Sequence, residues 1–219
     1  MGKANRVAEG TLGQLRLGPR QVAKEVTLWP LVLPLQDCPP GPELWPLEEA
    51  LEDGFVAILA AAEPGRVRIE SRAPAPVWIA AGEPLGAAGR AAESTVLGPH
   101  GGAPVDVLSG GPSCDRCCGA FAEAFHGAED QVGFVLSVHD RAVGLELVLA
   151  PGLLTRRLRH RVAAWAPWLL GLEARGEDDL GLESPEALLA ALRSGHRLGG
   201  ARVALVWPGG SRSAWSLPM

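Results

Sequence analysis

The most regular feature of the sequence is a pair of apolar segments in its second half. Residues 132–139 are mostly apolar, and in residues 142–149 the odd-numbered positions carry Val or Leu while the even-numbered ones include Ala, Gly and Glu. Alternation with a period of two indicates a strand that buries one face. We therefore predict a β-hairpin from these two segments, with its turn at Asp140–Arg141.

Helical periodicity is clearest over residues 153–173. One face of this predicted helix is apolar, because large side chains recur every three or four positions. They are Leu154, Leu158, Val162, Trp165 and Leu169. The same segment carries a basic run from Arg156 to Arg161. We interpret it as the solvated face of the helix, with binding to an acidic or phosphate-bearing partner as the alternative.

Two shorter helices are indicated by their start signals. Pro46 suits the first position of a helix over residues 46–53, and Gly54 is a natural residue to follow its end. Ser184 is a typical N-cap residue and is followed by Pro185.

Short β-rich or alternating segments separate these helices. They predict strands over residues 26–33, 55–60, 66–71, 76–81, 95–97, 104–108, 203–207 and 213–217. Many strands, then a helix, then further strands indicate an α+β protein with a largely antiparallel sheet. The 219 residues suit one large domain. We predict a single strand-rich domain over residues 12–219, with one long and two or three short helices, after a flexible lead-in over residues 1–11.

Composition narrows the classes of partner. The net charge is −5, and Lys3 and Lys24 are the two lysines of the chain. Binding to a phosphate backbone needs a concentrated positive surface, so we expect no nucleic-acid partner. No apolar stretch approaches the length of a membrane span, so we expect no membrane partner either. The polar N-terminus lacks a signal-peptide pattern, which leads us to expect a cytoplasmic protein without structural disulfides.

A cysteine cluster lies at the start of a further predicted helix over residues 114–126. Cys114, Cys117 and Cys118 include a Cys-x-x-Cys spacing, which suits one edge of a tetrahedral zinc site. The same spacing at a helix start also suits redox chemistry, and three reduced thiols without a function are a further interpretation. We predict no cofactor, and we keep zinc at this cluster as an alternative.

An ordered series of segments resembles a known family. The series includes Trp29–Pro30–Leu31, Ala-Gly-Glu-Pro-Leu at residues 81–85, Ser94 to Leu97, and the hairpin from Val132 to Glu146. Over roughly residues 12 to 217 it resembles the ARG- and rhodanese-phosphatase-superfamily-associated protein domain, a strand-rich bacterial family without an established biochemical activity. By association, the resemblance implies a role near ADP-ribose or nucleotide metabolism.

The resemblance also indicates candidate binding residues. Where the family carries a stretch like Gly-Ala-Lys-Gln-Asn-Arg, residues 86–91 of this chain read Gly-Ala-Ala-Gly-Arg-Ala, so the Lys, Gln and Asn are missing and Arg90 is offset by one position. Glu83 is retained, and Glu146 stands where an Asp is usual. The implied binding residues that remain are Glu83, Arg90 and Glu146.

Three hypotheses follow. The first is a non-catalytic or eroded domain that binds a small ligand or a protein partner. The second is an enzyme that acts on a nucleotide or an ADP-ribose-type substrate, which requires Glu83, Arg90 and Glu146 to converge in one concave pocket. The third is a structural module stabilised by zinc at the cysteine cluster.

Overall fold

A computed structural model gives the architecture as α+β, with strands that are mostly antiparallel, as the sequence predicts. The structure describes residues 12–34, 44–61, 63–80, 83, 85, 89–91, 95–99, 105–110, 121–149, 152–173, 184–194, 202–207 and 210–215. The predicted lead-in over residues 1–11 lies outside these ranges, and so do Cys114, Cys117 and Cys118.

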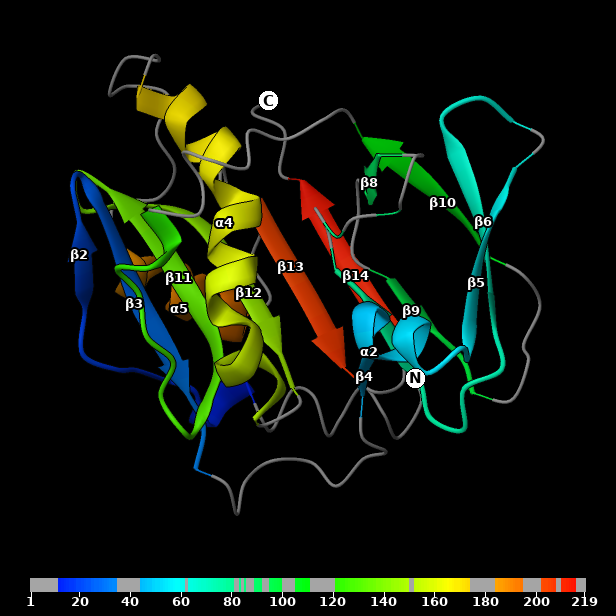
Figure 1. The fold of residues 1–219 in the computed structure, drawn as a ribbon. Helices are drawn as coiled ribbons and strands as arrows, with labels where there is room; N and C mark the ends of the chain where they lie inside the picture. Colours follow the sequence, from blue (N-terminus) through cyan, green and yellow to red (C-terminus); the bar gives the residue numbers. More distant parts are fainter. Residues whose placement is uncertain are drawn as a thin grey trace.

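A seven-stranded sheet forms the larger part of the molecule (Figure 1). Its order is β1-β3-β11-β12-β13-β14, and β2 also pairs with β3. The strands are β1 Arg16–Leu17, β2 Gln21–Ala23, β3 Val26–Val32, β11 Gln131–Val138, β12 Arg141–Val148, β13 Arg202–Trp207 and β14 Gly210–Trp215. β12 and β13 run parallel, whereas the other neighbours in this sheet are antiparallel.

The hairpin of β11 and β12 is present, but its turn differs from the prediction by one residue. Val138 pairs with Arg141, so the turn residues are His139 and Asp140. Both have positive φ angles, 50° and 63°. Two residues with positive φ match the right-handed twist of the flanking strands. The register also shifts between Leu136 and Ser137, which is consistent with the displaced turn.

Both faces of the large sheet are covered by helices. The chain leaves β12, forms α4 (Leu153–Glu173) and α5 (Pro185–Ser194), and returns as the parallel strand β13. α4 lies in front of the sheet in Figure 1 and α5 behind it. Ser184 caps α5 as predicted, because its Oγ accepts a hydrogen bond of 3.1 Å from the Ala187 N–H.

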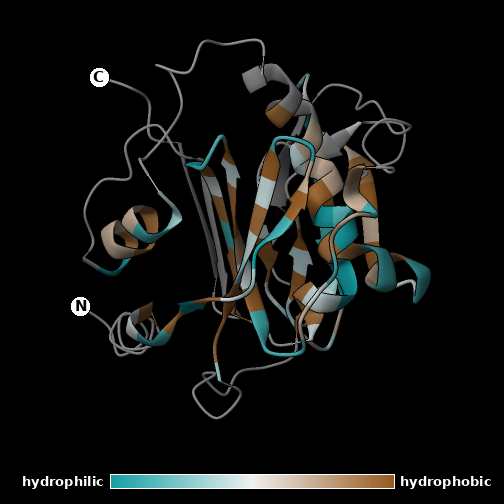
Figure 2. Ribbon diagram, turned by 90° about the vertical axis from the view of Figure 1, so that its left-hand side faces the viewer, coloured by the Kyte–Doolittle hydropathy of each residue, from teal (hydrophilic) through white to brown (hydrophobic). Residues whose placement is uncertain are grey.

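The two helices bury opposite sets of strand residues. Phe134 and Leu136 pack in one core with the apolar face of α4. Val135 and Leu145 pack in another core with three leucines of α5, which are Leu188, Leu189 and Leu192. Successive side chains of a strand point to opposite faces, which explains the division. Figure 2 shows the apolar positions concentrated on the strands between the helices.

Two smaller sheets complete the described part of the fold. One has the order β5-β6-β10-β8, and the other has the order β4-β7-β9. Their strands are β4 Trp45–Pro46, β5 Val56–Ala60, β6 Arg66–Ser71, β7 Val77–Ile79, β8 Arg90–Ala91, β9 Thr95–Leu97 and β10 Val105–Gly110. A third apolar core joins strands β4 to β9 to the short helix α2 (Leu47–Glu52).

Helix α2 begins one residue later than the sequence predicts. Pro46 has extended backbone angles and lies just before the first helical residue, Leu47. Gly54 follows the end of the helix with a φ of 72°, as predicted, because glycine adopts this conformation without a steric penalty. Within the described residues, no helix is long and apolar enough to cross a membrane.

Candidate functional site

Glu146 of β12 lies fully buried beneath α4 and accepts three hydrogen bonds. Arg161 donates from Nε to Oε1 at 2.6 Å and from Nη2 to Oε2 at 3.0 Å. Trp165 donates from Nε1 to Oε2 at 2.7 Å. Both carboxylate oxygens are therefore engaged by groups on one helix, and the side chain is 0% exposed.

Local geometry explains how this cluster forms. Arg161 and Trp165 are four residues apart, so they project from the same face of α4. Gly144 precedes Glu146 by two positions on the same face of β12, and its missing side chain leaves room for the Trp165 ring. The interpretation of residues 156–161 as a solvated face is wrong for Arg161, which is 2% exposed. Its guanidinium also lies 5.5 Å from the centre of the Trp78 ring, a cation–π contact.

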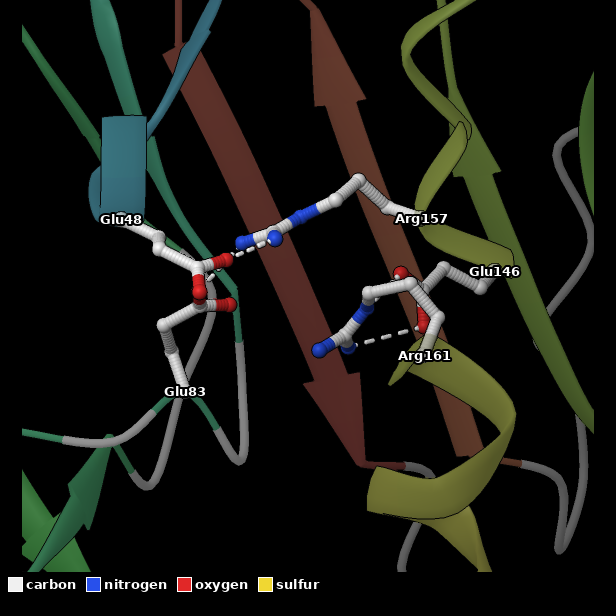
Figure 3. Close-up of polar contacts among 5 residues, drawn as sticks. All are labelled: Glu48, Glu83, Glu146, Arg157 and Arg161. Atoms are coloured by element: carbon white, nitrogen blue, oxygen red, sulfur yellow. Dashed lines mark hydrogen bonds and ion pairs between the residues drawn. The ribbon is translucent and has the colours of Figure 1, made fainter. Parts of the chain in front are cut away.

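Arg157 forms a second ion-pair group one helical turn away. Its Nη2 donates to Oε1 of Glu83 at 2.8 Å, and its Nη1 donates to Oε2 of Glu48 in the first turn of α2. Figure 3 shows Arg157 extending from α4 toward these two carboxylates, while Arg161 points to Glu146. Exposure decreases along this group, from 55% for the Glu48 side chain to 15% for Arg157 and 6% for Glu83.

The backbone holds Glu83 beside strand β8. The Glu83 N–H donates to the Ala80 carbonyl at 2.9 Å, and the Glu83 carbonyl accepts from the Ala91 N–H at 2.8 Å. Arg90 precedes Ala91 in β8, so its backbone lies next to Glu83. The side chain of Arg90 lies outside the described part of the structure, and its predicted role stays a prediction.

The structure thus brings two of the three predicted residues to neighbouring turns of α4. Glu83 meets Arg157 and Glu146 meets Arg161. Sequence reasoning missed Glu48, which lies in the first turn of α2. The spacing of four between Arg157, Arg161 and Trp165 was the one available signal for the partners, because it places all three on one stripe of the helix.

Charges and burial shift three pKa values in this group. The hydrogen bond from Arg157 lowers the pKa of Glu48, and the charge of Arg157 adds to this effect. Burial alone would lower the pKa of Arg161, but the charge of Glu146 and its hydrogen bonds raise it above the usual value. Burial lowers the pKa of His160; the charges of Arg157 and Arg161 lower it further, while those of Glu83 and Glu48 oppose the shift.

The lowered pKa of His160 predicts a pH-dependent stability. In the unfolded chain the imidazole titrates near the ordinary histidine pKa of 6.5, whereas the folded chain resists protonation. Below that pH the unfolded state binds more protons, so the free energy of unfolding falls as the pH falls. We expect urea denaturation to show this loss between about pH 7 and about pH 5, and a smaller loss in His160→Gln.

A matched control is available at the hairpin turn. His139 is 45% exposed and lies 3.5 Å from a carboxylate oxygen of Glu25, and its positive φ suits asparagine, so His139→Asn removes a surface histidine and keeps a favoured turn residue. We expect His160→Gln to change the pH profile more than this variant does. A profile that His160→Gln leaves unchanged would contradict the assignment.

The zinc hypothesis is not addressed by these contacts. Among the described residues, no group of three or more His, Cys, Asp or Glu side chains is placed to hold a metal ion. Cys114, Cys117 and Cys118 lie outside those residues, so zinc at this cluster stays a hypothesis.

The candidate site is therefore a layered group of charges between α2, Glu83, β12 and α4. Its inner pair, Glu146 with Arg161, is enclosed, and its outer members, Glu48 and Arg157, reach the surface. No protein-family model, curated protein or solved structure matches the chain.

Proposed function

We propose that this chain is a non-catalytic binding domain that holds a small polar ligand at Glu83 and Arg157. The observation that carries the proposal is the difference between the two acidic residues. Glu146 is enclosed and uses both oxygens within the fold, whereas within the described residues the Glu83 side chain bonds to Arg157 through one oxygen. Glu146 thus serves the core, and Glu83 retains capacity for a ligand.

The polar groups at this place suit a ligand with hydroxyl and anionic groups. The Arg157 guanidinium carries five N–H donors. One of them donates to Glu83 and one to Glu48. The second oxygen of Glu83 is an acceptor for a hydroxyl group, in the way that acidic residues of nucleotide-binding folds hold a ribose. This chemistry agrees with the ADP-ribose or nucleotide ligand that the resemblance implies.

A catalytic alternative rests on His160. The lowered pKa keeps its imidazole neutral near neutral pH, and the charge of Glu83 acts on it. A neutral histidine that is subject to the charge of a carboxylate suits a general base. Turnover of ADP-ribose or a nucleotide that is lost in His160→Gln would favour the enzyme over the binding domain.

A thermal-shift screen tests the proposal. Metal-stripped protein is melted with ADP-ribose, NAD, common nucleotides, magnesium and zinc. A ligand at 100 times its dissociation constant adds about 2.7 kcal/mol. For a chain of this size that corresponds to a rise in Tm of roughly 5–10 °C, at about 2–4 °C per kcal/mol. We expect a rise with a hydroxyl-bearing anion, and none in Arg157→Gln.

Two further variants make the result specific. Arg156→Gln removes the same charge from an exposed neighbour on α4 and should keep the ligand response. Arg157→Gln leaves Glu83 without its cation, so Arg157→Gln combined with Glu83→Gln provides a neutral pair that folds without a buried charge. A ligand response that survives in this double variant would place the ligand elsewhere. A rise with zinc alone would favour the cysteine cluster, and no rise with any compound would favour a protein partner.

A further inference from the structure

The two carboxylates on Arg157 are held very differently. Glu83 is 6% exposed, and its backbone is fixed by hydrogen bonds to Ala80 and Ala91. Glu48 is 55% exposed and lies on α2, a helix of six residues. Breaking an exposed ion pair costs far less free energy than removing one partner of a buried pair. A competing anion would therefore displace Glu48 long before Glu83.

We propose that Glu48 occupies the position of the ligand's anionic group on Arg157, and that a carboxylate or phosphate of the ligand replaces it there. This inference rests on the proposed function, because it assumes that the ligand binds at Arg157. It assigns the anionic part of the ligand to the outward Nη1 of the guanidinium. It also makes Glu48 an internal competitor that weakens binding in the free protein.

The charge balance supports such an exchange. Three carboxylates, those of Glu48, Glu83 and Glu146, face the two guanidiniums of Arg157 and Arg161. Once Glu48 turns to solvent, two carboxylates and two guanidiniums remain, and one new anionic group restores the original balance. Arginine suits this role because its planar fork pairs with carboxylate and phosphate oxygens.

The test compares two neighbouring glutamates with inorganic phosphate as the probe. Glu48 and Glu49 are both exposed in the first turn of α2. Of these two described residues, Glu48 is the one that bonds to Arg157. Glu48→Gln and Glu49→Gln change the net charge equally. We expect Glu48→Gln to bind phosphate about two- to fivefold more tightly than Glu49→Gln, the factor that corresponds to loss of a competing surface ion pair.

The outcomes separate this inference from the proposed function. Equal phosphate affinity in the two glutamine variants overturns the inference, and so does phosphate binding that persists when Glu48→Gln is combined with Arg157→Gln and Glu83→Gln. Circular dichroism confirms that each variant is folded. If a nucleotide-type ligand depends on Arg157 but phosphate is indifferent to Glu48, the proposed function stands and the inference fails. If Glu48→Gln alone gains phosphate affinity and no organic ligand binds, the inference stands and the proposed ligand class fails.

Discussion

Replacement of Glu146 by alanine is expected to lower the free energy of unfolding by about 3–5 kcal/mol, the usual cost of removing one partner of a buried ion pair. Arg161 is 2% exposed and would keep its charge without the carboxylate that receives its Nε and Nη2 hydrogen bonds. Trp165 would also lose the acceptor of its Nε1–H. Equilibrium unfolding in urea measures the change.

Two comparisons make this result specific to the buried pair. Glu63 pairs with Arg66 at 2.9 Å on the surface, where its side chain is 73% exposed, so Glu63→Ala should cost less than about 1 kcal/mol. Glu146→Met combined with Arg161→Met removes both charges and should recover much of the lost stability. If Glu146→Ala costs no more than Glu63→Ala, the buried ion pair is not the source of stability described here.

Local patterns predicted much of the fold. The long helix over residues 153–173 has the bounds that its periodicity indicates, and the N-cap at Ser184 and the glycine after α2 are where their residue types favour them. These features depend on interactions within a few positions of the chain. The strands β1, β2, β4 and β8 were missed, because they are two or three residues long and carry too short a pattern.

The position of Glu146 shows what local patterns cannot give. The alternation in residues 142–149 predicted one buried face and one exposed face. The chain instead places α4 and α5 on opposite faces of the sheet before it returns as β13, so both faces of β12 are buried. A glutamate that the pattern assigns to the polar face thereby lies inside the protein.

Only the acidic residues of the candidate site were predicted from the sequence, again because local patterns do not give long-range contacts. Glu83 and Glu146 were singled out, but their partners Arg157 and Arg161 were interpreted as part of a solvated face. Helical periodicity identifies which residues share a stripe and does not identify what covers it. The partners come from positions 74 and 15 residues away in the sequence, respectively, and contacts at such separations depend on the complete topology.

The acidic residues that pair with Arg157 and Arg161 differ in what their substitution should change. Substitutions at Glu146 should act on stability, since its oxygens meet only groups of α4 among the described residues. Substitutions at Glu48 should act on ligand affinity, since its side chain is mostly exposed. Comparison of the two sites separates the fold from the proposed function.

Replacement of Gly144 by alanine is expected to lower the free energy of unfolding by about 1–3 kcal/mol, the range for overpacked cores. An added Cβ would lie 2.3 Å from Cζ3 and 2.8 Å from Cη2 of Trp165. The ring cannot move away without loss, because its Nε1 donates to Glu146 at 2.7 Å and it forms a T-shaped contact with the Phe134 ring at a centroid distance of 6.2 Å. Urea denaturation measures the cost, and tryptophan fluorescence reports displacement of the ring.

Gly98 is the matched control, because a Cβ there would meet nothing within 4 Å. Gly98→Ala should change stability by less than about 0.5 kcal/mol. Gly144→Ala should also cost less in a Trp165→Leu background than in the wild type, because the smaller side chain removes the clash and makes the two effects non-additive. If the two costs are additive, the destabilisation by Gly144→Ala does not come from a clash with the Trp165 ring. The close packing of α4 on β12 would then not explain why a glycine is needed at this position.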